Sequence, residues 1–420
     1  MYETMNSEIE QFENSISNKK LKETFQNCFY DTLKHSISYL DKDNVYIITG
    51  DIPAMWLRDS SASVVQYIGF AKDDEDVRKM LVGLLNRDYF YIGIDPYSNS
   101  FNLKPDFAGH KEDEGLRTPY TWERKFEIDS LCYPIWLQYK LYKSVGSKEV
   151  IPSSFIPTCR TILKVFSTEQ RHSELSKYFH YRPGEKEEFC IPNRGKGGED
   201  KYTGMIWSGY RPSDDACKYS YFIPGNMFAV VILKMMSEML MDLSESELAS
   251  EALRIGKEVE GGIRKYGIYH SDKFGDIYAY ETDGNGNYTL MDDANVPSLL
   301  SIPYFGYESC NMPIYKNTRA YCLSESNPFF FKGEVLTGIG SPHTPKGFVW
   351  PMGMILQALT TDSDEEKKSI LQMLLNSDDN TCLMHEGINK DNQKDYTRPW
   401  FTWCNSLFSY FLLSNKDLIK

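Results

Sequence analysis

The chain has 420 residues, of which 41% are hydrophobic and 25% are charged, and its formal net charge is −13. This composition is that of a globular protein with a large core, and an acidic balance without a basic block argues against nucleic acids and anionic membranes as partners. The nine scattered cysteines form no close pair, which is typical of reduced thiols in a cytosol rather than of a disulfide framework or a zinc site.

The N-terminal region predicts helices. Residues 1–12 have neither the basic nor the apolar region of a secretion signal, so we expect a cytoplasmic protein. No apolar run approaches the length of a membrane span. From Ile9 to Leu33 apolar residues recur at steps of three and four, which predicts one helical stripe.

Between residues 45 and 170 the pattern remains mainly helical. A short strand over 45–49 is followed by a helix that Asp59 or Ser60 can cap and that runs to about Ala71, which places Trp56 and Arg58 at its mouth. Further helices are predicted over 75–90, 122–142 and 151–170, and the polar segment 93–121 is long enough to indicate a functional loop.

The second half begins with a polar loop over 181–201 and the motif WSGYRPSDDA at 207–216. Pro212 disfavours a helix there, so Asp214 and Asp215 are expected on a loop or at a helix mouth. Short strands are predicted over 266–288. Helices are predicted over 225–243, 244–265 (with a Ser244–Glu247 capping box), 293–303, 348–359, 363–375 (with a Ser363–Glu366 capping box) and 399–413.

The count is about eleven or twelve helices in antiparallel pairs, and no linker divides them. Motif-bearing loops join the helices at intervals along residues 1–420. We therefore expect a single all-α domain, an (α/α)6 toroid of about six helical hairpins with short β segments in its loops. An open helical solenoid fits the count too, but no repeat of fixed period is visible.

The candidate chemistry is a pair of carboxylates. Asp214 or Asp215, and Glu386 in HEGIN, lie on separate motifs, and glycoside hydrolysis needs one carboxylic acid and a second carboxylate. An adjacent carboxylate and the indole of Trp207 are expected to raise the pKa of the acid. HEGIN lacks the second histidine of a zinc motif, and DGNGNY at 283–288 lacks the glycine and glutamate of a calcium loop, so we expect no metal and no cofactor.

Four stretches, TGDIPAMWLRDSSA (49–62), WSGYRPSDDAC (207–217), MDDANVPSLL (291–300) and HEGINKDN…RPWFTWCNSLF (385–408), together resemble glycoside hydrolase family 125, the exo-acting α-1,6-mannosidases. The resemblance implies an (α/α)6 barrel and an inverting, metal-independent release of mannose from non-reducing ends. It assigns the general base to Glu386 and the general acid to Asp214 or Asp215. Asp214 is preferred because the first aspartate of an SGxDD-like run resembles the acid of related glycosidases.

The remaining roles are hypotheses about a mannose-containing oligosaccharide. Arg58 and Asp59 could bind vicinal hydroxyls, with Asp59 alternatively only a helix cap. Arg211 could bind a carboxylate or a sugar hydroxyl, or pair with a surface acid. Glu127 and Asp129 suggest a lining face or a buried pair. The other candidates are three aromatic stacking residues and five polar residues on loops: Trp56, Trp207, Trp403, His110, His270, His343, Asp292 and Asn295.

An inverting mechanism requires the two carboxyl groups to stand about 6.5–9.5 Å apart, whereas about 5 Å would indicate a retaining enzyme. The alternatives are another hexose specificity on the same toroid, such as an α-glucosidase, a phosphorolytic enzyme, or a non-catalytic glycan-binding barrel. We expect a monomer.

Overall fold

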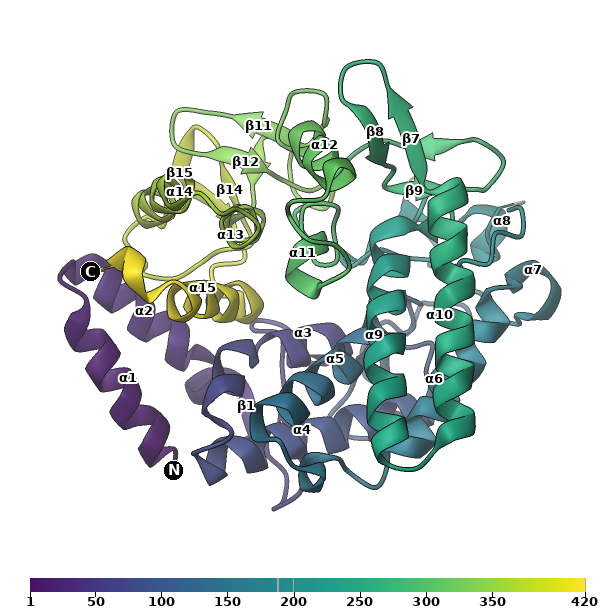
Figure 1. The fold of residues 1–420 in the computed structure, drawn as a ribbon, viewed down its shortest axis with the longest axis horizontal. Coiled ribbons are helices and arrows are strands. Elements are labelled where there is room, and N and C mark those ends of the chain that lie inside the picture. The colour runs from purple at the N-terminus through teal and green to yellow at the C-terminus, as the bar shows by residue number, and fades with distance from the viewer. Residues whose placement is uncertain (187–188, 199, 420) are drawn as a thin grey trace.

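The computed structural model describes residues 1–186, 189–198 and 200–419, and its helices form a ring of hairpins (Figure 1). The inner helices are α3 (Leu57–Ala62), α5 (Ile128–Val145), α9 (Ile223–Asp242), α11 (Ile302–Phe305), α13 (Pro351–Leu359) and α15 (Thr402–Ser414). The outer helices are α2 (Lys19–Asp31), α4 (Glu75–Ile94), α6 (Phe155–Glu169), α10 (Ser246–Tyr266), α12 (Pro313–Cys322) and α14 (Asp364–Asn376). This is the (α/α)6 barrel that the sequence predicts.

Contacts between neighbouring inner helices run round most of the ring. Helix α5 contacts α3 and α9, α11 contacts α9, and α15 contacts α13 and α3. Helix α15 also contacts α2, so the last inner helix joins the first hairpin, and α1 (Glu3–Ser15) lies on the outside (Figure 1). The buried apolar side chains form one cluster that runs from Tyr2 to Leu412.

The difference between inner and outer helices follows from their sequences. Helix α9 is mostly apolar and buries most of its residues, whereas α10 buries one stripe that includes Ala249, Ile255 and Val259. Helix α9 is long and apolar enough to cross a membrane, because its most apolar 18-residue stretch has a mean hydropathy of 1.3. However, 83% of that stretch is buried inside the protein. Helix α9 is therefore a core helix of the barrel.

Short antiparallel strands pair within the loops that join the helices. They form six small sheets: β1 (Ile37–Tyr39) with β2 (Val45–Ile47); β3 (Met55–Trp56), β4 (Ser100–Phe101) and β5 (Thr121–Glu123); β6 (Tyr221–Phe222), β9 (Glu281–Thr282) and β10 (Tyr288–Thr289); β7 (Ile268–Ser271) with β8 (Gly275–Tyr278); β11 (Phe330–Lys332) with β12 (Thr337–Ile339); and β13 (Phe348–Val349), β14 (Gly387–Asn389) and β15 (Asn392–Thr397).

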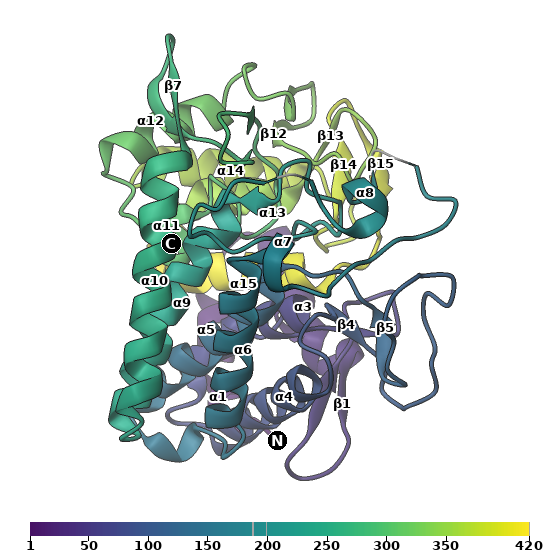
Figure 2. The same ribbon diagram turned by 90° about the vertical axis from the view of Figure 1, so that its right-hand side faces the viewer.

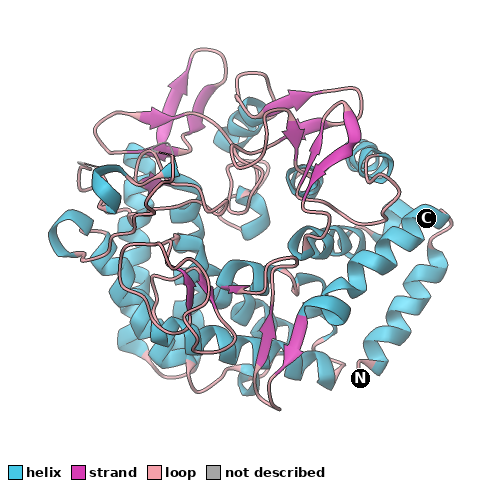
Figure 3. Cartoon of the chain, turned by 180° about the vertical axis from the view of Figure 1, so that it is seen from behind, coloured by secondary structure: helices cyan, strands magenta, loops and turns pink. Residues whose placement is uncertain are grey.

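Three of these strands, β3, β6 and β13, lead directly or within one residue into α3, α9 and α13. The motif-bearing loops therefore gather where the inner helices begin. Figure 2 shows β4, β5, β14, β15 and α8 (Pro192–Gly195) on one side of the helices, and Figure 3 shows this end facing the viewer. The remaining short elements are η1 (Thr32–Ser36), η2 (Val65–Phe70), η3 (Lys148–Val150), α7 (His172–Leu175) and η5 (Lys416–Ile419).

The predicted helix from Asp59 or Ser60 to Ala71 is wrong in its cap and in its length. The N-cap residue is Trp56, and α3 ends at Ala62 before the 3-10 helix η2 begins. Trp56, Arg58 and Asp59 nevertheless lie at the helix mouth, as predicted.

The predicted helix over 293–303 is also wrong, because only Ile302–Phe305 is helical. The carboxylate of Asp292 accepts the backbone N–H groups of Leu299 (2.8 Å) and Leu300 (3.0 Å), which fixes a turn instead. The sequence did not indicate α12.

Two helix starts also differ from expectation. Helix α5 begins at Ile128 rather than at residue 122, because residues 121–123 pair with β4. Ser244 does not cap α10, whose N-cap residue is Glu245. The second predicted cap is confirmed, since the hydroxyl of Ser363 accepts the backbone N–H of Glu366 at 3.1 Å.

Candidate active site

A cavity of 250 Å³ lies where α3 and α15 begin. It brings together Asp214 and Glu386, which are 172 residues apart (386 − 214). Its wall combines aromatic rings with charged and polar side chains: Thr49, Ile52, Trp56, Arg58, Asp59, Pro212, Ser213, Asp214, Asn295, His343, Trp350, Glu386, Arg398, Phe401 and Trp403.

Arg58 is the charged centre beneath this cavity and is only 3% exposed. Its Nη1 lies 2.6 Å from Glu127 and 3.1 Å from Asp129, and its Nη2 lies 3.2 Å from Asp214. Its Nε is 3.4 Å from Asp59. Glu127 and Asp129 are thus a buried pair, one of the two possibilities that their sequence context suggests, and one guanidinium contacts four acids.

Replacing Arg58 by methionine is expected to lower the free energy of unfolding by about 3–5 kcal/mol, because buried carboxylates would lose their common partner. Urea unfolding monitored by circular dichroism measures this loss. The matched control is Arg254→Met, which removes an exposed helix pair with Glu258 and should cost about 1 kcal/mol or less. Equal losses in the two variants would contradict the role of Arg58.

Asp214 is presented on a tight loop that the surroundings hold in an uncommon conformation. Its φ of 64° lies in the left-handed region, which non-glycine residues seldom adopt and which recurs at functional sites. Lys125 Nζ donates to its main-chain oxygen at 2.7 Å, and Asn99 Nδ2 donates to its carboxylate at 3.2 Å. A bridge between Tyr210 and Ala216 closes the loop. The carboxylate is therefore fixed in the cavity wall.

The expectation of a raised pKa at Asp214 or Asp215 is wrong. Burial opposes ionisation of Asp214, but the charge of Arg58, a hydrogen bond with Glu127 and the charge of Lys125 hold the pKa of Asp214 well below its usual value. Burial instead raises the pKa of Glu127 well above its usual value. Asp214 is therefore the more acidic partner of its hydrogen bond with Glu127.

Asp215 has different neighbours and does not line the cavity that contains Glu386. His343 Nδ1 lies 3.2 Å from its carboxylate, and Ser213 donates to it at 2.9 Å. Burial opposes ionisation, yet the hydrogen bond and charge of His343 lower the pKa of Asp215. Conversely, burial disfavours the imidazolium but Asp215 raises the pKa of His343 to about 9. Asp215 and His343 thus form an ion pair beside the cavity.

Glu386 is a buried carboxylate in the same lining, 6% exposed and directly before β14. Burial raises its pKa, while the charges of His343 and Arg398 limit the rise. Arg398 Nη1 lies 3.8 Å from Glu386 and holds Asp51 through Nε at 2.9 Å. Glu386 therefore has the properties of a carboxylate that can accept a proton.

Aromatic residues complete the cavity. Trp56, Trp350, Phe401 and Trp403 line it, and the guanidinium of Arg58 lies 5.6 Å from the ring of Trp403. The indole N–H of Trp56 is buried and has no hydrogen-bond partner within the described part of the chain. These aromatic rings suit the apolar faces of a pyranose, and the indole N–H of Trp56 could donate to one of its hydroxyl groups.

Comparison with known proteins decides the family. A family model described as metal-independent alpha-mannosidase (GH125) matches residues 18–413. The chain belongs to glycoside hydrolase family 125. It is therefore a glycoside hydrolase. Across the residues that the structure describes, no group of three or more histidine, cysteine, aspartate or glutamate side chains is placed to hold a metal ion.

Relatives of this family 125 chain cover nearly its whole length. A Streptococcus pneumoniae metal-independent α-mannosidase, solved as a non-productive complex with α-1,6-mannobiose, is 38% identical over 99% of both chains, with a TM-score of 0.97. The Schizosaccharomyces pombe meiotically up-regulated gene 157 protein is 35% identical over 98% of this chain and 85% of its own. A bacterial glucoamylase shares the fold at 11% identity and a TM-score of 0.62, over 97% of this chain and 58% of its own.

Several predicted sugar-binding residues of the family 125 chain lie outside the cavity. Trp207 is 1% exposed and stacks on the ring of His172 at 3.7 Å, so it is a core residue. Arg211 pairs with buried Glu281 at 2.8 Å rather than with a surface acid. Asp292 is fully buried and holds the turn described above.

The two remaining histidine hypotheses are also corrected. His110 lies on the loop before β5 and pairs with Glu112 at 3.2 Å, outside the cavity. His270 lies on β7 with 72% of its side chain exposed, and it pairs with Asp276. Both residues sit on polar loops or hairpins as the sequence suggests, but only His343 reaches the site.

Sequence reasoning missed other residues of the site. Trp350 is the N-cap residue of α13, as Trp56 is of α3, so an aromatic residue before an inner helix is the signal that would have found it. Arg398 and Phe401 lie inside the RPWFTW motif but were not singled out. Lys125 and Asn99 carry no recognisable motif.

Proposed function

We propose that this family 125 enzyme is an inverting exo-α-mannosidase that hydrolyses terminal α-1,6-linked mannose. The observation that carries the proposal is that Asp214 and Glu386 line one cavity of 250 Å³. This volume lies below the range of about 300–1,000 Å³ for sites of drug-sized ligands, which favours a single terminal sugar. The linkage is suggested by the relative that binds α-1,6-mannobiose.

In this proposal Asp214 is the general acid. It lines the cavity with Glu386, whereas Asp215 is engaged by His343 outside it. Because the pKa of Asp214 is lowered and that of Glu127 is raised, the proton is held on Glu127 in the free enzyme. It passes through their hydrogen bond to Asp214, which donates it to the glycosidic oxygen as the bond to the leaving group breaks.

Glu386 is the general base in the same cavity lining. Its carboxylate removes a proton from a water molecule that attacks the anomeric carbon, and the water then bonds to the face opposite the leaving group. We expect the two carboxyl groups to stand about 6.5–9.5 Å apart to leave room for this water. The charges of Arg398 and His343 favour the ionised form of Glu386 against the effect of burial on its pKa.

The other cavity residues would bind the sugar. Asp59 and Asn295 present oxygen and nitrogen atoms for hydroxyl groups, and Trp56 and Trp403 present ring faces. The nine cysteines are scattered along the sequence without a close pair, which supports a cytoplasmic location as part of this proposal.

The anomeric form of the first product tests the mechanism. NMR of α-1,6-mannobiose hydrolysis should show β-mannose before mutarotation, because inversion converts the α linkage into a β hemiacetal. Initial α-mannose would show retention and exclude Glu386 as a base that acts through water.

The pH dependence of kcat/KM should follow the loss of the positive charge on His343. A pKa raised to about 9 means that the imidazolium is present below that pH and is lost above it. Its side chain is 40% exposed, so solvent screens the pair and kcat/KM should fall at or somewhat below pH 9. His343→Gln should remove this alkaline limb, whereas His270→Gln, on an exposed hairpin, should keep it. An unchanged limb in His343→Gln would contradict the assignment.

A further inference from the structure

The catalytic cavity continues into two more cavities. The first, of 270 Å³, shares Asp214 and His343 with the catalytic cavity. The second, of 730 Å³, shares Asp215 with the first. The three adjoining cavities, called the groove below, follow one another from Glu386 past the two aspartates, and the far one is much larger than a single terminal sugar needs.

Two segments contribute to every part of this groove. In residues 207–218, Asp214 faces the catalytic cavity and Lys218 lines the 730 Å³ cavity. In residues 338–346, His343 faces the catalytic cavity and Lys346 lines the 730 Å³ cavity. The segments that position the acid therefore also shape the far cavity, which places it on the leaving-group side of the scissile bond.

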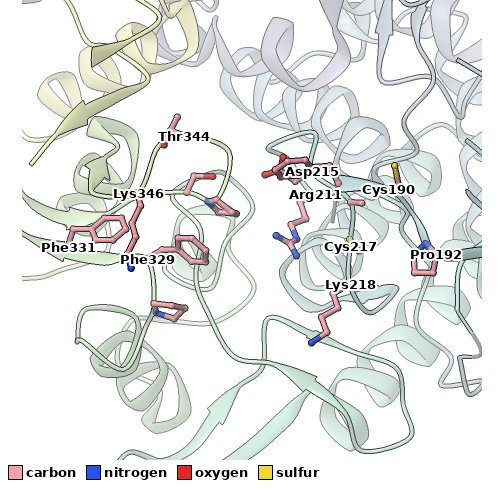
Figure 4. Close-up of a pocket in the computed structure, with 15 residues that line it drawn as sticks. Cys190, Pro192, Arg211, Asp215, Cys217, Lys218, Phe329, Phe331, Thr344 and Lys346 are labelled. Atoms are coloured by element: carbon pink, nitrogen blue, oxygen red, sulfur yellow. The ribbon is translucent and has the colours of Figure 1, made fainter. Parts of the chain in front are cut away.

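The far cavity carries fixed aromatic side chains. Phe329 and Phe331 both line it, and residues two apart on an extended segment face the same side (Figure 4). Gly340 donates its backbone N–H to the carbonyl oxygen of Phe329 at 2.8 Å. A Cβ at Gly340 would meet the ring of Phe331 at 2.8 Å, so the glycine allows this ring to lie close against the loop. Such rings suit the apolar faces of sugars.

The far cavity is also positively charged within an acidic protein. Lys218 and Lys346 are exposed on different walls (Figure 4), and neither has a carboxylate within 4.0 Å in residues 1–186, 189–198 and 200–419. Arg211 is held by Glu281, and Asp215, the acidic residue of this lining, is held by His343. Two ammonium groups without a carboxylate partner among the described residues thus face this cavity, in a chain whose net charge is −13.

We propose that the 730 Å³ cavity binds the leaving-group part of an anionic mannoside, an oligosaccharide that carries a phosphate or carboxylate group near Lys218 and Lys346. The proposal rests on the exo-mannosidase function. The rings of Phe329 and Phe331 contact the sugar faces, and the two ammonium groups attract the anion. The enzyme thereby selects charged oligosaccharides over neutral ones of equal length.

The test uses three α-1,6-mannotriosides with a hydroxypropyl, a phosphopropyl or a carboxyethyl aglycone. Release of terminal mannose from any of them tests the exo-mannosidase function. The ratio of kcat/KM between an anionic and the neutral substrate tests the proposal. We expect a ratio of about ten for wild type at low salt, which high salt reduces.

Variants locate the effect. The double change Lys218→Gln and Lys346→Gln should bring the ratio close to one, and Lys218→Arg with Lys346→Arg should restore it because the charge returns. Lys164→Gln, an exposed residue on α6, is the matched control and should keep the wild-type ratio. A preference for phosphate alone would identify a phosphorylated saccharide, and an equal preference for both anions would identify charge as the determinant. A wild-type ratio near one, or a preference that survives the double change to glutamine, would overturn the proposal.

Discussion

Replacing Glu386 by glutamine is expected to lower kcat on α-1,6-mannobiose by about 10³- to 10⁴-fold, because general-base catalysis contributes up to this amount and the amide cannot accept the proton of water. Glutamine keeps the size of the side chain, so the fold and KM should change little. Steady-state release of mannose measures the effect.

The matched control is Glu238→Gln on α9, whose carboxylate is exposed and pairs with Lys143. That variant should keep wild-type kcat. If Glu386→Gln also stays near wild type while circular dichroism shows an intact fold, Glu386 is not the base.

Replacing Asp214 by asparagine should produce a loss that depends on the leaving group. On α-1,6-mannobiose, whose leaving group must be protonated, kcat should fall by about 10³-fold. On 2,4-dinitrophenyl α-mannoside, whose leaving group departs as a stable anion, the loss should be about tenfold or less. The ratio of the two effects is the measurement, because a merely structural defect would slow both substrates equally.

Asp215→Asn is the comparison within the same motif. Its carboxylate is paired with His343 and lies outside the catalytic cavity, so the variant should slow both substrates to a similar extent. A leaving-group dependence in Asp215→Asn and none in Asp214→Asn would reverse the assignment of the acid.

The fold was predictable because the helices carry strong local signals. The apolar stripes of α2 and α10 and the mostly apolar sequence of α9 reflect their places in two layers, and pairing them in sequence order produces the ring. The errors fell where tertiary contacts determine the backbone. Residues 293–301 have a helical pattern, yet Asp292 binds two of their amides and holds a turn. The periodicity of a single sequence cannot reveal that a side chain will accept these backbone hydrogen bonds.

The two carboxylates were predictable as residues, but their electrostatic environment was not. The adjacency of Asp214 and Asp215 predicts a raised pKa, and the opposite holds because Arg58 and Lys125, distant in sequence, reach Asp214. Trp207 was expected beside them and instead packs on His172 in the core. Side-chain direction within a loop depends on the whole fold, so motif membership alone could not separate Trp207 from Trp56.

Closure of the ring by α15 has a consequence for how the chain reaches its working form during synthesis. Helix α15 contacts both α2 and α3, and the segment from Glu386 to Trp403 supplies one wall of the catalytic cavity. Until these C-terminal residues leave the ribosome, the apolar faces of α2 and α3 that contact α15 stay exposed, and the catalytic cavity lacks part of its lining. Nascent chains of this length expose surfaces on which chaperones act, and activity can begin only after the last inner helix docks.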